Sequence, residues 1–282
     1  MTLFQVGAGS GGIVVLDLLA RDPRVTRVVL VEPDVFAPHN VHRHVFPASA
    51  VGRMKAELAA EWVKERRPEL TIETHVADLT DPAMLLTFEK LAAECDVGVC
   101  AVDNEAAKYA FDALMRKARK PWTLGEVLSG GIGGWVHRFT PDGPCYGCVA
   151  SHLQRTVTEA PASPPPDYAN PGGPVAETTI PASKASIDVI AGLHALVTLD
   201  LLSEAGSQDN PASQRPASEH EFTSLLFTLK RVPGVFEDAF RPFRLRVPKS
   251  PGCLFCSAVP VPHTGEDLDV ALDQALARLG HE

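Results

Sequence analysis

Residues 7–12 read Gly-Ala-Gly-Ser-Gly-Gly, and this stretch decides the fold. It ends a short apolar run at residues 3–7, which is typical of a buried parallel strand. The sequence from Gly11 to Leu19 then has the spacing of a helix. Glycines let backbone N–H groups approach phosphate oxygens, and the helix N-terminus attracts their negative charge. The stretch therefore predicts a phosphate-binding loop between a strand and a helix.

The spacing inside this loop matches a nucleotide-binding pattern. Gly7, Gly9 and Gly12 satisfy G-x-G-x-x-G. Glu32 ends the next predicted strand, 20 residues after Gly12, where a carboxylate accepts hydrogen bonds from ribose hydroxyls. The pattern predicts an adenine nucleotide, and by itself it does not choose between NAD, FAD and ATP.

The alternation of strands and helices continues as far as residue 127. After the first strand and helix, the predicted strands are 27–32, 72–77, 97–102 and 122–127, and the predicted helices are 55–65, 82–93 and 106–118. Such an alternation is typical of an α/β fold with a doubly wound, mostly parallel sheet. We therefore expect a Rossmann-like architecture.

The second half of the chain has a different texture and predicts a C-terminal antiparallel extension. Its predicted elements are antiparallel strands in 130–139, later strands at 222–231 and 243–247, a long apolar helix at 183–205 and a terminal helix at 267–279. Residues 157–182 and 206–217 are rich in Pro, Ser and Ala and predict loops too short to mark a domain boundary. We expect a single domain over 1–282, with a nucleotide-binding half at 1–128 and a second half at 129–282.

The residues that follow Glu32 favour a triphosphate. Asn40, Arg43 and Lys55 fall where a dehydrogenase would run directly into its next helix. Two cations suit a triphosphate better than a pyrophosphate that glycine amides already bind. This favours ATP, with an NAD-dependent oxidoreductase as a minor alternative.

Asp103 and Asn104 follow the predicted strand 97–102. Open α/β sheets bind ligands at the carboxyl ends of their strands. A carboxylate at that edge is a hard oxygen ligand of the kind that Mg²⁺ prefers. Asp103 is therefore a candidate magnesium ligand.

Two C-x-x-C pairs, Cys145 with Cys148 and Cys253 with Cys256, supply four thiolates. Four thiolates form the tetrahedral ligand set of a structural zinc site. Because 104 residues separate the pairs, the site would be a long-range clip rather than a zinc finger. No fifth ligand lies beside the pairs in sequence, so we expect a closed, non-catalytic zinc site.

Several other residues admit a chemical role, but packing is the simpler interpretation. We expect Cys95 and Cys100 to be small buried residues rather than nucleophiles. His194 lies among leucines and is expected in the core. His44 adjoins the motif arginine and is expected to pack or bond around the nucleotide. Glu126 follows a strand and is expected to be a solvated loop acid, the alternative being a second carboxylate of the site.

Composition limits the class of protein. The 26 Lys and Arg against 35 Asp and Glu give a net charge of −9, which argues against nucleic acid or an anionic membrane as the partner. No run approaches 18 apolar residues, so no membrane span is expected. The N-terminus has no basic region and no cleavage site, which favours a cytoplasmic protein. Its six cysteines would then be thiols or metal ligands.

In order and spacing, these motifs resemble the ThiF/MoeB/HesA family, the bacterial relatives of ubiquitin-activating enzymes. The resemblance runs from residue 3 to about residue 256 and is far more specific than any single motif. It rests on Gly7–Gly12, Glu32-x-Asp34, Asn40-x-x-Arg43, Gly52-x-x-Lys55, Asp103-Asn104 and the two C-x-x-C pairs.

The resemblance implies a nucleotidyltransferase that adenylates the C-terminal carboxylate of a ubiquitin-like or sulfur-carrier protein and releases pyrophosphate. It implies that ATP, Mg²⁺ and Zn²⁺ are bound. Glu32 would bind the ribose, Asp103 would hold Mg²⁺, and the four cysteines would hold zinc. The residues implied to bind the nucleotide are Gly7, Gly9, Gly12, Glu32, Asp34, Asn40, Arg43, Lys55, Asp103 and Asn104. Those implied to act in catalysis are Arg43, Lys55 and Asp103.

The chain also departs from the family pattern. The family usually has a helix before the first strand that supplies an arginine to the neighbouring subunit, and this sequence begins at the strand. His44 stands where the family often has Gln, and Lys108 replaces a more usual arginine. The stretch from Tyr168 to Lys184 has no cysteine, which excludes a thioester on that loop.

These departures leave the assembly and the substrate open. We expect a homodimer, since the sheets of this family pair through the long helix and neighbouring strands. The alternatives are a catalytically incomplete subunit whose partner supplies the arginine, and adenylation of a different acyl substrate. A variable loop and the tail of the partner would decide the acceptor.

Overall fold

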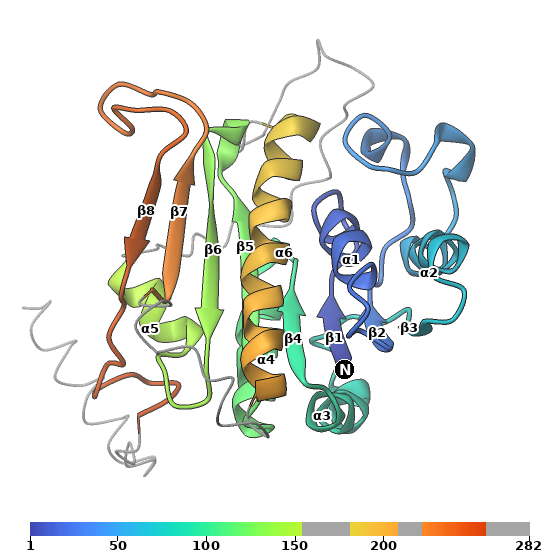
Figure 1. Cartoon of the computed structure of the whole chain (residues 1–282), viewed down its shortest axis with the longest axis horizontal. Helices are drawn as coiled ribbons and strands as arrows, with labels where there is room; N and C mark the ends of the chain where they lie inside the picture. The colour runs from blue at the N-terminus through green and yellow to red at the C-terminus, as the bar shows by residue number, and fades with distance from the viewer. Residues whose placement is uncertain (154–180, 208–221, 258–282) are drawn as a thin grey trace, which may run out of the picture.

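An eight-stranded sheet organises the computed structural model, which describes residues 1–153, 181–207 and 222–257 (Figure 1). The strands are β1 (Thr2–Val6), β2 (Arg27–Val31), β3 (Thr71–His75), β4 (Val97–Cys100), β5 (Trp122–Val127), β6 (Gly133–Phe139), β7 (Ser224–Thr228) and β8 (Pro242–Leu245). The helices are α1 (Gly12–Ala20), α2 (Lys55–Arg66), α3 (Leu85–Glu94), α4 (Glu105–Lys117), α5 (Tyr146–His152) and α6 (Lys184–Ser207). Short 3₁₀ turns are η1 (Pro38–Asn40), η2 (Ala48–Ala50), η3 (Pro82–Met84) and η4 (Ser129–Gly131).

The first five strands are parallel, and they confirm the doubly wound fold. The sheet order is β3-β2-β1-β4-β5-β6-β7-β8, so the direction of winding reverses between β1 and β4. Val6 at the end of β1 pairs with Val31 on one side and Cys100 on the other. Crevices at such a reversal are where open α/β sheets bind ligands. Each predicted element in this half lies within two residues of its observed bounds except the helix predicted at 82–93, whose first three residues form the η3 turn ahead of α3.

Beyond β5 the sheet continues with three antiparallel strands, as predicted. β5 pairs with β6, β6 with β7 and β7 with β8. The predicted strand 222–231 is shorter than expected, because the chain leaves the ladder after Thr228. Helix α5 was not predicted. The predicted terminal helix 267–279 lies outside the described residues, as do most of the predicted loops 157–182 and 206–217.

Helices cover both faces of the sheet. In Figure 1, α1 and α6 lie in front of the strands, and their apolar residues pack on Leu3, Leu30 and Val99. The other face packs on α3 and α4. There the ring of Phe111 lies 5.5 Å from that of Phe4 and 5.4 Å from that of Trp122. The sheet is thus the middle layer of three.

Among the described residues, α6 is the one helix long and apolar enough to cross a membrane. It packs against α1, β4, β5 and β6, and 56% of its most apolar window is buried. The core of the protein therefore accounts for its apolar composition. The expectation that no segment is apolar enough to span a membrane rested on uninterrupted apolar runs. It missed α6 because polar residues are scattered along this helix.

The prediction that His194 lies in the core is confirmed. The residue is 1% exposed, and Nε2 lies 2.9 Å from Oγ1 of Thr123. The same Thr123 oxygen is 2.7 Å from Oγ1 of Thr198. Burial lowers the pKa of His194 to about 4, so the imidazole is neutral at pH 7.

This histidine makes the stability of the fold depend on pH. Between pH 6.5 and pH 4 the unfolded chain binds a proton at His194 that the folded chain does not. Stability is therefore lost as the pH falls below about 6.5, by about 1.4 kcal/mol per pH unit. We expect wild-type protein to lose about 2 kcal/mol more than His194→Gln between pH 7.5 and pH 5 in urea unfolding. Equal losses in the two proteins would contradict the assignment.

Candidate functional site

Two of the three glycines of the G-x-G-x-x-G motif are required by packing, and one is open. Gly7 has φ +91°, and a Cβ there would lie 2.4 Å from the carbonyl oxygen of Ala101. A Cβ on Gly12 would lie 2.4 Å from the carbonyl oxygen of Gly7. A Cβ on Gly9 would meet no described atom within 4 Å. Gly9 therefore marks the face of the loop that a ligand can approach.

Buried polar side chains hold this loop in place. Nε2 of Gln5 donates to the carbonyls of Gly7 at 3.0 Å and Gly12 at 2.8 Å. A carbonyl oxygen only accepts, so Nε2 of His44, 3.0 Å from the Ala8 carbonyl, carries the proton. Burial lowers the pKa of His44 to about 4 and keeps the ring neutral. Gln5 was not predicted as a site residue, and the one sign of its role in the sequence is an amide within an apolar strand.

Glu32 joins the glycine loop to the end of β2. One carboxylate oxygen accepts from the amide of Ala8 at 2.6 Å, and the other accepts from the amide of Asp34 at 2.9 Å. The residue is 4% exposed, and burial raises the pKa of its carboxyl group. Glu32 thus orients the loop, and each oxygen keeps a second lone pair for a further donor. Its contact with a ribose remains a prediction.

Lys55 lies beside the loop because α2 starts there. The bridge between Val35 and Met54 brings the two segments together. Nζ of Lys55 donates to Oδ2 of Asp34 at 2.7 Å. The lysine side chain is 8% exposed, whereas that of Asp34 is 62% exposed. The cation is therefore held at the site by a partner that water can reach.

The other motif residues of this segment have mixed surroundings. Oδ1 of Asn40 accepts from the amide of Ala37 at 2.9 Å and so fixes the η1 turn. Arg43 follows this turn and is partly exposed. Arg43 lies close enough to His39 to lower the pKa of that imidazole, together with burial.

Asp103 follows β4, the strand beside β1, by three residues. It follows Ala101, whose carbonyl lies against Gly7, so the carboxyl ends of β1 and β4 meet here. Asp103 is exposed and, among the described residues, makes no hydrogen bond or ion pair. Oδ1 of Asn104 accepts from the amide of Ala107 at 3.1 Å and caps α4. Asp103 is free to bind a cation, whereas Asn104 already has a structural role.

A buried charged cluster adjoins this edge and corrects one expectation. Nζ of Lys108 donates to Glu105 at 2.5 Å and to Glu126 at 2.6 Å. Burial alone would lower the pKa of Lys108, but attraction to Glu126 and Glu105 outweighs burial and raises it. Glu126 is 13% exposed and also bonds His137 at 3.1 Å. The prediction of a solvated loop acid was wrong: Glu126 lies within β5, paired with Trp135, and its carboxylate is held by Lys108 and His137.

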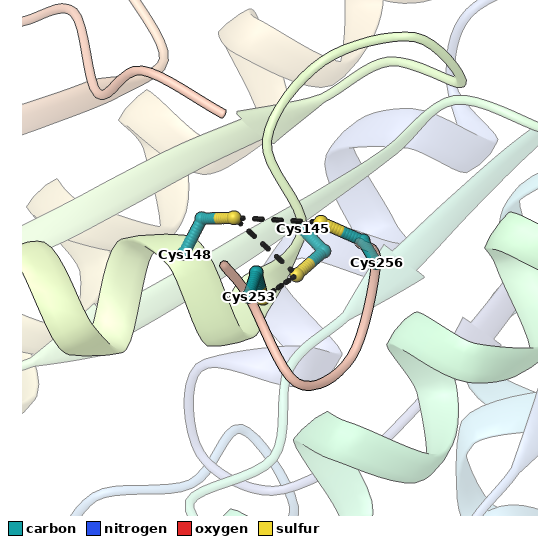
Figure 2. A group of neighbouring side chains, drawn as sticks. All are labelled: Cys145, Cys148, Cys253 and Cys256. Atoms are coloured by element: carbon teal, nitrogen blue, oxygen red, sulfur yellow. Dashed lines mark hydrogen bonds between the residues drawn. The ribbon is translucent and has the colours of Figure 1, made fainter. Parts of the chain in front are cut away.

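The four cysteines of the C-x-x-C pairs come together (Figure 2). Their Sγ atoms all lie within 4.8 Å of one another. Cys145 is 3.7 Å from Cys148 and 3.5 Å from Cys253, and Cys148 is 3.5 Å from Cys256. Tetrahedral zinc with bonds of about 2.3 Å places sulfurs roughly 3.8 Å apart. The amide of Ser250 also donates to Sγ of Cys148 at 3.4 Å, so the residues fit a structural zinc ion.

The remaining thiols are confirmed as packing residues. Cys95 and Cys100 are both fully buried. Burial raises the pKa of each thiol to about 12, so neither forms a thiolate near neutral pH.

The chain is similar in sequence to known proteins. A family model described as "ThiF family" matches residues 2–234. "Adenylyltransferase and sulfurtransferase MOCS3" of Anopheles gambiae is 29% identical over 264 residues, which cover 92% of this chain and 47% of that protein. "SAMP-activating enzyme E1" of Haloferax volcanii is 31% identical over 145 residues, 51% of each chain. The chain thus spans about half the length of these curated relatives.

Solved structures support the fold. A crystal structure of E. coli MccB with ATP superposes with a TM-score of 0.61 at 17% identity, covering 91% of this chain and 66% of MccB. MccB in complex with N-formylated MccA gives a TM-score of 0.62 at 18% identity, covering 91% and 67%. At this identity the likeness establishes the architecture alone.

The glycine loop offers a matched pair of variants. We expect Gly9→Ala to unfold within about 0.5 kcal/mol of wild type, because its Cβ meets nothing in the described structure. We expect Gly12→Ala to lose about 1–3 kcal/mol, because its Cβ would press on the Gly7 carbonyl. Urea unfolding measures both changes. The reverse order would show that the loop is packed differently.

The cysteine cluster predicts one zinc ion per chain in metal analysis of the purified protein. We expect Cys253→Ser to lose the metal and several kcal/mol of unfolding free energy, because zinc binding contributes directly to folding. Cys95→Ala is the control, since it removes a buried thiol outside the cluster and should retain zinc. Full zinc in Cys253→Ser would overturn the assignment.

Proposed function

The chain belongs to the ThiF family, and from this membership we propose that it is an ATP-dependent adenylyltransferase. It would activate the C-terminal carboxylate of a ubiquitin-like or sulfur-carrier protein and release pyrophosphate. One observation carries the proposal: the open glycine loop follows β1, and the two strands beside β1 lead to the Lys55–Asp34 pair after β2 and to Asp103 after β4. The names of the relatives, an adenylyltransferase and an activating enzyme, also support it.

The proposed reaction needs positive charge and positioning more than a base. A carboxylate would attack the α-phosphate of ATP in line with the departing pyrophosphate, so two anions must approach each other. Amides of the loop at Gly9 and the side chains of Lys55 and Arg43 would bind phosphate oxygens and stabilise the charge that develops. Lys55 can change partner from Asp34 to a phosphate without moving into water, since its side chain is almost buried.

The other predicted ligands complete this proposal. Glu32 would accept from the ribose hydroxyls with its remaining lone pairs. Asp103 would hold Mg²⁺, which when bound neutralises phosphate charge. The four cysteines would hold a zinc ion with a structural role, because their tetrahedral set leaves no open position.

The proposed assembly is a cytoplasmic homodimer. Each chain would form a single domain over 1–282, with a nucleotide-binding half at 1–128. A second subunit that supplies an arginine remains the alternative. The net charge of −9 supports a protein partner over nucleic acid.

Exchange of labelled pyrophosphate into ATP tests the function. We expect exchange that depends on a ubiquitin-like protein encoded beside this one, because the carboxylate must attack before pyrophosphate leaves. A carrier whose C-terminus is amidated is the control for the carboxylate, because it has no oxyanion to attack the α-phosphate. ATP binding without exchange, with every candidate carrier, would contradict the proposal and favour the incomplete-subunit alternative.

Two variants test the residue roles in the same assay. We expect Asp103→Asn and Arg43→Ala to lower exchange by about 10²–10³-fold, because each removes charge stabilisation at the phosphates. The matched control is Asp142→Asn, whose side chain is 88% exposed and lies after β6, beyond the opposite edge of the parallel strands. Wild-type exchange in Asp103→Asn would exclude Asp103 as the magnesium ligand.

A further inference from the structure

Helix α4 is hydrogen-bonded to both C-x-x-C loops. Tyr146 lies inside the first pair, and its amide donates to Oδ1 of Asp112 at 3.0 Å. Phe255 lies inside the second pair, and its carbonyl accepts from Arg116 at 2.7 Å. Asp112 and Arg116 are themselves paired at 2.8 Å and lie one turn apart on α4. One helix thus contacts both halves of the cysteine cluster.

Aromatic packing strengthens this contact. The ring of Tyr109 on α4 lies 4.9 Å from that of Tyr146 and 4.7 Å from that of Phe255. A Cβ on Gly147 would lie 2.4 Å from the ring of Phe255. The two C-x-x-C loops and α4 therefore pack without spare room, and a shift of either loop must move side chains on the helix.

Tyr146 also makes a hydrogen bond, through its side chain, to the first turn of α4. The hydroxyl of Tyr146 donates to Oε2 of Glu105 at 2.8 Å. The other oxygen of Glu105 accepts from Lys108, which also bonds Glu126 on β5. Tyr146 is fully buried and Lys108 is 4% exposed, so water cannot replace these partners without opening the structure. Glu105 begins α4, two residues after Asp103.

We infer that α4 couples metal binding at the four-cysteine cluster to nucleotide binding at the carboxyl ends of β1 and β4. Tyr146 is the positioning residue. Zinc would fix the two C-x-x-C loops, the loops fix α4, and the Tyr146–Glu105 hydrogen bond fixes the turn that presents Asp103. The last step, from Asp103 to bound nucleotide, rests on the proposed function. Coupling between two sites is reciprocal, so nucleotide binding must also tighten zinc binding by the same factor.

A single hydroxyl tests the coupling. Tyr146→Phe removes the donor to Glu105 and leaves the ring, and we expect MgATP to bind at least about fivefold more weakly. We also expect faster hydrogen exchange over residues 103–109, with zinc content unchanged. Tyr109→Phe is the matched control, because the Tyr109 hydroxyl makes no hydrogen bond to any described residue. It should behave as wild type in both measurements.

The inference would be overturned if Tyr146→Phe and Tyr109→Phe had equal affinity for MgATP and equal rates of hydrogen exchange over residues 103–109. If Tyr146→Phe loses zinc, wild-type protein decides: its zinc affinity, measured by competition with a chelator, should rise at least about fivefold when MgATP is added. An unchanged zinc affinity would then overturn the coupling. Wild-type protein that binds no MgATP would contradict the proposed function instead. In that case exchange over residues 103–109 must still rise when zinc is removed, or the coupling fails as well.

Discussion

The close approach of Gly7 to Ala101 is the constraint on which the rest of the site depends. A Cβ at Gly7 would lie 2.4 Å from the Ala101 carbonyl oxygen, a separation that no side chain permits. The absence of a Cβ lets the loop after β1 lie directly on the end of β4. The glycine loop therefore lies against residues 101–102, directly before Asp103. Gln5 and Glu32 then fix the loop from beneath, through backbone groups that no helix or strand satisfies.

Sequence predicted most of the fold because the parallel half is determined by local signals. Apolar runs that end in glycine or an acid mark each strand, and the helical spacing between them forces crossover connections. Helix α5 escaped prediction because its seven residues are too few to show a helical period, and Tyr146 and Val149 pack it into the core formed by other elements. Glu126 was misread for a related reason: the residues that pair with it, Lys108 and His137, lie on other elements.

The candidate site was predictable in its residue types and less so in their partners. Spacing alone identified the glycines, Glu32 and the four cysteines, and the structure brings each group together. The spacing did not show that Asn104 caps α4 or that His44 is hydrogen-bonded to the glycine loop. Both contacts depend on where the backbone turns, which a single sequence does not reveal. The motifs therefore located the candidate site, and the hydrogen bonds of the structure showed which of its residues have a structural role.

Burying Lys108 between two carboxylates is a poor way to gain stability. Removing such charges from water costs several kcal/mol for each ion, and apolar residues of similar size often stabilise a protein as well or better. What a buried ion pair does supply is direction, since its hydrogen bonds are satisfied in one arrangement only. Here that arrangement fixes the first turn of α4, with Asp103 just before it, against β5. The remainder of the same helix lies on the cysteine loops. Helix α4 is therefore the element through which a structural metal can affect the geometry of a site at the other end of the helix.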